Sequence, residues 1–367
     1  MKFSILQQDI LPVLSSVSRS TGIRSTLPVL GNMLLSAEGK KLKAAATNLE
    51  IGVIKYISAE VLEEGDITIP AKTLLEVIQS LGSVKLDFET QGEVLNLVSG
   101  KFKASINGIG ANEFPVIPLP DGEGVMFKKE VFKSCSQILF ASASDEGRPV
   151  LTGILTQASR GKMDFVATDG FRLAHKEVKI DNLSEFKCLI PRKTFEEILR
   201  VAEEDAGEGA DIEIYTISSQ NQIIFKIGQA VISSRLIEGS FPSWEKIIPS
   251  EFKARAVVER GDLVSASKLA SVFARSEANV VTLNAQKDKF IITSAAKELG
   301  SQTNEVEAQI EGEEFSIAYN AKFLLDVLSA VNTGQIIMEF SGPLSPTLVK
   351  PVGIEGLEYI LMPVRVS

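Results

Sequence analysis

The sequence contains one histidine, two cysteines and one tryptophan in 367 residues. A metal site built from several histidines is therefore impossible, and a Ser-His-Asp triad would have to use His175. Cys135 and Cys188 lie far apart in apolar segments, so we expect two reduced core thiols and no disulfide. The chain also lacks phosphate-binding glycine loops, dinucleotide fingerprints and zinc-protease motifs. These absences predict a protein that is not an enzyme and that needs no metal and no cofactor.

Long hydrophobic runs are absent as well. No stretch approaches the roughly 18 apolar residues that would span a bilayer. The first residues, Met1–Ile5, alternate like a strand and lack a signal-peptide hydrophobic region, which predicts a cytoplasmic protein. The net charge is −9, which argues against a generally basic surface that coats nucleic acid but leaves room for a local basic face.

One short segment occurs three times, and this is the strongest pattern in the sequence. The copies are Ile69–Ile78, Ile190–Leu199 and Tyr319–Leu328. In each copy Pro70, Pro191 or Asn320 stands just ahead of a lysine and an apolar pattern of helical period. Each copy is therefore predicted to be the end of a strand that runs into a helix.

The repetition extends beyond this helix. Pro28 corresponds to Pro149, and the segment Ala46–Asn48 corresponds to Ala167–Asp169 in the same register. A second helical pattern precedes these strands in every copy, beginning with an acidic residue that favours a helix N-terminus, at Asp9, Glu130 and Asp262. Each repeat is long enough to form a domain with its own core.

Short alternating runs separated by Gly, Asn and Asp turns fill the rest of each repeat. Two helices among many antiparallel strands predict an α+β domain. We place the boundaries in the loops at Pro118–Gly124 and Pro249–Glu251. The predicted domains are residues 1–122, 126–249 and 251–367.

The segment Ala167–Ala174, the three helix copies and the C-terminal Met362–Val366 together resemble the bacterial DNA polymerase III β subunit, the replicative sliding clamp. The resemblance covers the whole chain. It implies the DNA clamp fold, in which two three-domain subunits join head to tail as a homodimer and six domains form a ring around double-stranded DNA. The implied function is that of a processivity factor, without catalytic activity, that a clamp loader opens and that works in the cytoplasm on the nucleoid.

The resemblance also implies that basic residues on or beside the repeated helices contact DNA phosphates, whose negative charge attracts lysine and arginine. The alternative for each residue is an ordinary solvated helix face. The residues expected to contact DNA are Arg24, Lys72, Arg148, Arg192, Lys193, Arg200 and Lys322, with Gly147 beside Arg148. In the second loop, Pro149 and Val150 stand where the family has aromatic residues.

A hydrophobic cleft between the second and third domains is the family's second working surface. It takes peptides of the Gln-x-Leu-x-Phe kind from the replicative polymerase, the clamp loader, and repair and translesion polymerases. The matching residues are Leu151, Thr168, Gly170, Phe171, Arg172, Leu173, Pro242, Lys246, Ile247, Phe323, Pro346, Ile360, Met362, Pro363, Val364 and Arg365. The resemblance implies that Arg172 and Arg365 orient peptide oxygens. For Leu151, Ile247 and Ile360, plain core is the alternative.

The residues expected to close the ring are Ala104 and Ile106 of the first domain and Val272 and Phe273 of the third. Phe273 also fits the apolar face of its helix with Leu269 and would then be simply buried. Two other functions stay open at this point. One is a triplicated peptide-binding hub that does not encircle DNA, and the other is a hydrolase with a site at His175, Asp169 and Thr168.

Overall fold

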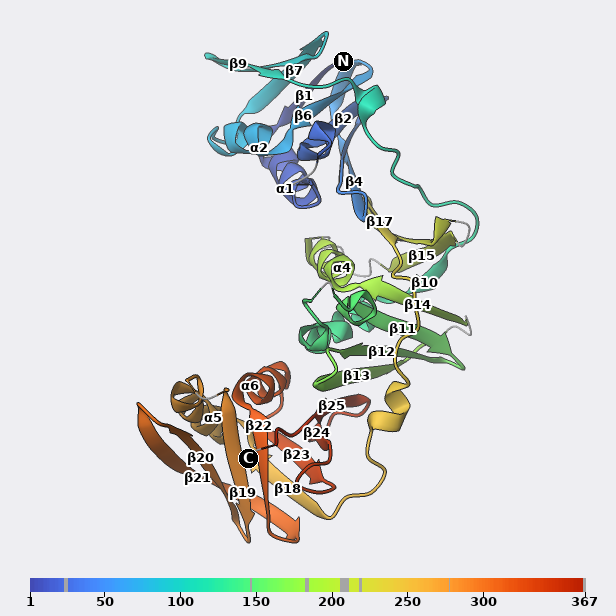
Figure 1. Ribbon diagram of the computed structural model, residues 1–367. Helices are drawn as coiled ribbons and strands as arrows, with labels where there is room; N and C mark the ends of the chain where they lie inside the picture. Colours follow the sequence, from blue (N-terminus) through green and yellow to red (C-terminus); the bar gives the residue numbers. More distant parts are fainter. Residues whose placement is uncertain are drawn as a thin grey trace. The chain divides into compact units, whose positions relative to one another are not determined.

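The computed structural model describes residues 1–22, 26–145, 147–181, 185–204, 211–217, 220–276 and 278–365. It forms two compact units (Figure 1). The first unit comprises Met1–Phe132 with Lys193–Leu236, and the second comprises Lys133–Arg192 with Ile237–Ser367. In the described parts of the chain, none of the helices has the length and apolar character needed to cross a membrane.

The first unit contains two antiparallel sheets. The five-stranded sheet has the order β5-β1-β7-β8-β9, and the eight-stranded sheet has the order β10-β15-β16-β17-β4-β3-β2-β6. The strands are β1 (Lys2–Leu6), β2 (Asn32–Glu38), β3 (Lys41–Thr47), β4 (Ile51–Ser58), β5 (Glu60–Glu63), β6 (Gly65–Pro70), β7 (Lys85–Gln91), β8 (Val94–Ser99), β9 (Phe102–Asn107), β10 (Val125–Phe127), β15 (Ile212–Ile217), β16 (Gln222–Ile227) and β17 (Ala230–Arg235). The helices are α1 (Gln7–Ser18), α2 (Ala71–Gln79), α3 (Lys129–Lys133) and α4 (Arg192–Glu204), of which α3 and α4 each cross the unit boundary by one residue.

The second unit contains one twelve-stranded antiparallel sheet of order β14-β11-β12-β13-β25-β24-β23-β18-β21-β20-β19-β22. Its strands are β11 (Gly153–Ser159), β12 (Lys162–Thr168), β13 (Arg172–Lys179), β14 (Phe186–Pro191), β18 (Ala254–Glu259), β19 (Val280–Gln286), β20 (Lys289–Ala296), β21 (Gly300–Gly312), β22 (Phe315–Asn320), β23 (Gln335–Phe340), β24 (Thr347–Pro351) and β25 (Leu357–Leu361). Its helices are α5 (Arg260–Ala274) and α6 (Ala321–Ala330), which lie side by side as α1 and α2 do in the first unit (Figure 1). The predicted α+β class with antiparallel sheets is confirmed.

The three copies of the repeated segment have the predicted structure. β6 runs directly into α2, β14 into α4 and β22 into α6. α6 has a side-chain cap, in which Asn320 accepts hydrogen bonds from the backbone N–H groups of Lys322 and Phe323, whereas α2 has none. The preceding helix is shorter in the middle copy, where α3 ends at Lys133 and continues as a 3-10 turn over Ser134–Gln137.

The sheets continue from one repeat into the next at two places. β17 of the second repeat pairs with β4 of the first, and β25 of the third repeat pairs with β13 of the second. We call these pairings, with the turn and linker beside each, the first junction and the second junction. Around them the strand orders match, β17-β4-β3-β2-β6 and β25-β13-β12-β11-β14. The two junctions are therefore repeated copies of one arrangement.

Each junction has its own apolar core. At the first, Ile54, Val231 and Phe114 belong to one buried cluster; at the second, Leu173 and Ile360 belong to another. Cys135 is buried and Cys188 half-buried, and both are free thiols, as predicted. Burial raises the pKa of Cys188 to about 12, so this thiol stays protonated and unreactive near neutral pH.

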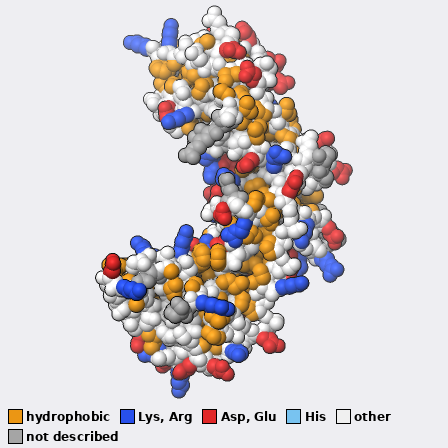
Figure 2. Space-filling model, in the orientation of Figure 1, with side chains coloured by type: hydrophobic (Ala, Val, Ile, Leu, Met, Phe, Trp, Pro, Cys, Tyr) orange, Lys and Arg blue, Asp and Glu red, His pale blue; other side chains and the backbone are white. Residues whose placement is uncertain are grey.

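Charged side chains of both signs are interspersed on the face drawn in Figure 2, with hydrophobic side chains exposed between them. This pattern agrees with a chain whose charge is −9 but which has 38 lysines and arginines against 47 acids. Basic groups are therefore available locally in spite of the acidic total.

Candidate functional site

A tight turn at the second junction forms the centre of the predicted peptide cleft. Thr168 Oγ1 donates to the carbonyl of Arg172 at 2.6 Å and accepts from the N–H of Gly170 at 3.1 Å. Asp169 Oδ1 accepts from the N–H groups of Phe171 and Arg172 at 2.9 and 3.0 Å. Gly170 has a φ of +90°, which glycine adopts without strain. The sequence Thr-Asp-Gly thus fixes the turn through its own side chains.

Arg172 ties this turn to two other segments. The residue is only 8 % exposed. Its guanidinium donates to Asp169 Oδ2 at 3.1 Å, to the carbonyl of Phe140 at 2.9 Å and to Asp326 of α6. It also lies 5.0 Å from the ring centre of Phe140 and 4.7 Å from that of Phe323. Three of its five N–H donors are thus used within the chain, and a direct contact with a peptide stays a prediction.

Phe171, next to Arg172, is 55 % exposed and stacks on Phe323 with ring centres 5.9 Å apart. The carbonyl of Phe171 accepts from the N–H of Met362 at 3.0 Å, and Val364 N–H donates to Ala318 at 2.8 Å. The C-terminal segment is therefore held beside the turn. Within it Met362, Pro363 and Val364 are half-buried and Arg365 is exposed.

The remaining predicted cleft residues differ in burial. Leu173 and Ile360 lie in the buried core, so plain core is the outcome for Ile360. Leu151, Ile247 and Pro346 are half-buried, while Pro242 and Lys246 are exposed. Sequence reasoning did not include Val150 or Trp244 among the cleft residues. Both side chains pack on the buried cluster that contains Leu173 and Ile360. The repeated pair Phe-Pro, at Phe114–Pro115 and Phe241–Pro242, was the signal that would have drawn attention to this linker.

His175 does not meet the partners that a hydrolase site requires. Its Nε2 lies 2.8 Å from Asp164 Oδ1, its Nδ1 lies 3.6 Å from Glu358, and its ring lies 4.4 Å from that of Trp244. Thr168 and Asp169 are engaged in the turn instead. Burial by itself would lower the pKa of His175, but the hydrogen bond to Asp164 and the nearby carboxylates of Asp164 and Glu358 outweigh it and raise the pKa above its usual value. The hydrolase alternative was therefore wrong about which groups come together.

Lys72, Lys193 and Lys322 occupy the same place in α2, α4 and α6, one residue after the first helical residue, and all three are exposed. Lys72 lies 3.9 Å from Glu76. Of the other basic residues expected to contact DNA, Arg200 pairs with Glu197, Arg148 donates to the carbonyl of Asp169 at 2.9 Å, and Arg192 is half-buried. Arg24 lies outside the described residues.

The four residues expected to close the ring lie on β9 and α5. Ile106 is buried and Ala104 half-buried, on the last strand of the five-stranded sheet. Val272 is 53 % exposed beside the half-buried Phe273. Leu269, one turn earlier in α5, is 56 % exposed. The apolar side chains of this helix face thus remain partly open to solvent, which favours an interface over a buried core face.

These features define a class of protein. Three copies of an α+β unit share continuous sheets, a surface turn is braced by a buried arginine, and the lone histidine has a structural environment. Among the described residues no three His, Cys, Asp or Glu side chains gather as a metal site would require. The class that the fold defines is a protein of repeated α+β units joined through shared antiparallel sheets.

Comparison with known proteins identifies the family. Sequence models of the DNA polymerase III beta subunit match along the chain, with the N-terminal domain at residues 1–118, the central domain at 126–243 and the C-terminal domain at 245–365. The chain is 31% identical to the beta sliding clamp of Synechocystis sp., covering 100% of this chain and 99% of that protein. It is also 31% identical to the beta sliding clamp of Caulobacter vibrioides, with 100% of both covered.

Solved structures agree. The DNA polymerase III β subunit of Thermotoga maritima has a TM-score of 0.93 at 26% identity, with 100% of both chains covered. That of Pseudomonas aeruginosa has a TM-score of 0.93 at 27% identity, again with 100% of both covered. The chain therefore belongs to the DNA polymerase III β subunit family. It is a sliding clamp, a non-catalytic processivity factor of DNA replication that works with DNA and a polymerase.

Proposed function

We propose that two copies of the chain close head to tail into a six-domain ring around duplex DNA, and that the cleft at the second junction tethers proteins by short peptides. The observation that carries the tethering part is the exposed Phe171, stacked on Phe323 beside the half-buried Met362. An exposed phenylalanine stacked on a half-buried one, next to a flexible thioether, suits leucine and phenylalanine side chains of several partners.

The cleft would take peptides from the replicative polymerase, the clamp loader, and repair and translesion polymerases. Phe171 and Lys246 stand where the family more often has histidine and arginine, so the peptide preference of this chain would differ in detail. Arg365 is exposed and has the donors to orient a glutamine side chain or a peptide carbonyl. Arg172 would act indirectly, by stabilising the turn that positions Phe171.

Electrostatics at the helix starts supports a DNA-facing role for Lys72, Lys193 and Lys322. A helix N-terminus carries partial positive charge, so a lysine there costs stability, and acids are the favoured residues. The same unfavourable choice occurs at all three helix starts. Phosphate groups outside the protein would offset the cost. Few such contacts are needed, because a closed ring holds DNA by topology.

Ring closure would use β9 and the exposed face of α5. β9 is the edge of its sheet, with β8 as its neighbour, and an unpaired strand edge is a ready interface. Phe273→Asp should give monomers by sedimentation, while Leu344→Asp, which places an acid at an exposed apolar residue outside the expected interface, should leave the dimer intact. A dimer that persists in Phe273→Asp would place the interface elsewhere.

The domain boundaries at residues 122–126 and 249–251 remain part of the proposal, because the sheets run on from one repeat into the next. A clamp that works on chromosomal DNA would belong in the cytoplasm, at the nucleoid.

Encirclement is tested by retention on a nicked circular plasmid. The protein is incubated with the plasmid, its clamp loader and ATP, and is then passed through gel filtration in high salt. Retention on the circle that is lost when the plasmid is cut would establish that the ring slides off DNA ends. No retention, with loader activity verified separately, would favour the peptide-binding hub that does not encircle DNA.

The cleft is tested by the affinity of a Gln-x-Leu-x-Phe peptide. Met362→Ala with Arg365→Ala should weaken binding while leaving the dimer unchanged. Leu62→Ala, which truncates an exposed leucine of the first unit, is the control and should bind the peptide normally. Unchanged affinity in the double variant would refute the assignment of the cleft.

A further inference from the structure

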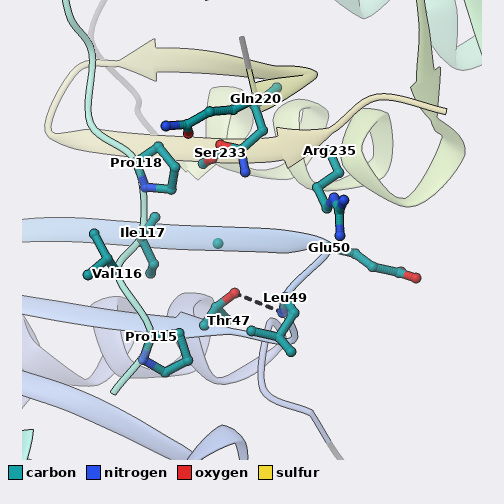
Figure 3. A pocket seen from close by; sticks show the side chains of 12 residues that line it. Thr47, Leu49, Glu50, Pro115, Val116, Ile117, Pro118, Gln220, Ser233 and Arg235 are labelled. Atoms are coloured by element: carbon teal, nitrogen blue, oxygen red, sulfur yellow. Dashed lines mark hydrogen bonds between the residues drawn. The ribbon is translucent and has the colours of Figure 1, made fainter. Parts of the chain in front are cut away.

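The first junction contains a pocket that the clamp function described above does not use. It has a volume of about 310 Å³, which lies within the usual range for ligand sites. Three segments line it, namely the turn Thr47–Glu50, the linker Pro115–Pro118, and β16 with β17 through Gln222 and Arg235 (Figure 3). All of them belong to the first unit.

The turn in this pocket repeats the one beneath Phe171. Thr47 Oγ1 donates to the carbonyl of Ile51 at 3.0 Å and accepts from Leu49 N–H at 3.0 Å, which is the bond drawn in Figure 3. Asn48 Oδ1 accepts from Glu50 and Ile51. Leu49 stands where the other turn has Gly170, and it has a φ of +75°. A branched side chain in this conformation costs about 1–3 kcal/mol, and such strain gathers at binding sites.

Polar groups without internal partners line the pocket. Gln222 Oε1 is buried and accepts no hydrogen bond within the part of the chain that the structure describes. Leaving such an acceptor unpaired costs about 1–3 kcal/mol. The Gln222 side chain lines the pocket, so a turn of its amide would bring Oε1 within reach of a ligand N–H group and remove this cost. Arg235 lies opposite Gln222 on the neighbouring strand. Its guanidinium makes no ion pair with any described residue, and the side chain of Glu50 extends away from it (Figure 3).

The linker supplies apolar surface beside these groups. Val116 is 93 % exposed, and Pro115 and Pro118 flank it along the wall of the pocket. Leu49 is half exposed on the turn opposite the linker. A ligand in the pocket therefore meets aliphatic side chains together with one acceptor and one cation.

The hollow also continues past the linker. Val116, Pro118 and Gln222 line a second, more open space of about 710 Å³ that reaches Leu119 and Thr216. A small anion would fill only the end at Arg235. An extended chain would follow the linker from Arg235 past Gln222, with its backbone N–H groups near the unpaired acceptor.

We propose that this pocket binds a short extended peptide of a partner protein that carries an aspartate or glutamate beside an aliphatic residue. The acidic side chain pairs with Arg235, a main-chain N–H donates to Gln222 Oε1, and the aliphatic side chain packs on Leu49 and Val116. The site is separate from the cleft at Phe171 and recognises a different chemistry.

The test is methyl NMR of the full-length protein with labelled isoleucines, in which Ile117 reports on this pocket and Ile247 on the cleft. The probe is the peptide acetyl-Val-Asp-Val-amide, compared with acetyl-Val-Asn-Val-amide, because neither peptide carries the leucine and phenylalanine side chains that the cleft is proposed to take. We expect the aspartate peptide to shift Ile117 and to leave Ile247 unmoved. It should bind about fivefold or more tightly than the asparagine peptide, as expected for a charge-assisted hydrogen bond.

Arg235→Gln should remove this preference, so that both peptides bind equally. Arg160→Gln, at an exposed arginine of the second unit, is the matched control and should keep the preference. No shift of Ile117 at millimolar peptide, or a preference that survives Arg235→Gln, would overturn the proposal. Neither result touches the cleft, because the Gln-x-Leu-x-Phe peptide reports at Ile247 independently.

Discussion

The two junctions use one scaffold for two different surfaces. Both place a Thr-based turn beside a Phe-Pro linker and a pair of strands from successive repeats. The turns use the same hydrogen bonds, made by Thr47 and Asn48 in one and by Thr168 and Asp169 in the other. The two turns therefore have the same backbone geometry. Their binding chemistry is set by the neighbouring side chains, which differ between the two repeats.

Three of the matched positions differ in the same direction. The strand registers match Gly52 with Leu173 and Ser233 with Ile360, and the turns match Glu50 with Phe171. Each partner at the second junction is the larger and more apolar one. The first junction has instead a hollow with hydrogen-bonding groups. At these three positions the second junction is therefore the more apolar of the two, although Arg172 and His175 of the second junction match Ile51 and Ile54 of the first.

The largest difference should lie at Arg172, which matches Ile51. Arg172→Met removes a buried guanidinium and leaves Asp169 and Asp326 without their partner, so we expect a loss of about 3–5 kcal/mol in unfolding free energy. Ile51→Met at the first junction exchanges one apolar side chain for another and should cost less than about 1.5 kcal/mol.

The single tryptophan makes this measurable, because Trp244 lies in the second unit. Urea unfolding followed by its fluorescence should shift strongly in Arg172→Met and little in Ile51→Met. Equal shifts of the unfolding midpoint in the two variants would mean that Arg172 does not stabilise the turn at the second junction.

A smaller effect is expected from filling the first junction. A Cβ on Gly52 would lie 2.8 Å from Ile117 Cγ2, so the linker lies against the bare strand where Leu173 stands in the other junction. Gly52→Leu should therefore cost about 1–3 kcal/mol by overpacking. Adding Ile117→Ala should recover part of the loss. Urea unfolding followed by far-UV circular dichroism would record the change, while unfolding followed by Trp244 fluorescence should be unaffected. If the double variant were as unstable as Gly52→Leu, the steric overlap with Ile117 would not be the cause of the loss.

The repeat and its helices could be predicted from sequence because they are local. Proline or asparagine ahead of Lys72, Lys193 and Lys322 marks the helix starts, and apolar spacing does the rest. The contacts of Arg172 could not be predicted from sequence, because its partners Phe140 and Asp326 come from distant segments. The pocket of the first junction has no motif at all. Gln222 lies opposite Arg235 because of the register of β16 and β17, and no residue spacing in the sequence predicts this pairing.

The next difference appears as pH changes. His175 faces Asp164 and Glu358 with Trp244 against its ring, whereas Ile54 and Val231 occupy the corresponding positions of the first junction. Because the folded-state pKa of His175 is raised, its contribution to stability is fully present below about pH 6.5 and is lost as the pH rises through the folded value.

The stability difference between the parent protein and His175→Gln, followed through Trp244 between pH 5.5 and about 8.5, should therefore shrink as pH increases. Ile54→Val, the matched change at the first junction, should cost the same at every pH. A difference that grows with pH would reverse the assigned sign and would mean that the histidine is buried in its neutral form.

The smallest effects concern the helix starts, the feature in which the two units do not differ. Lys322→Gln removes a cation from a helix N-terminus and should stabilise the protein by about 0.3–1 kcal/mol. Lys72→Gln should gain less, because it also removes the pair with Glu76, which contributes about 0.3–0.5 kcal/mol. Both variants should nevertheless slide off linear DNA faster than the parent when followed by single-molecule tracking. If the lysines contact phosphates, their removal should make the protein more stable and shorten its residence on DNA. Unchanged residence on DNA would mean that these lysines are solvated residues of an ordinary helix face.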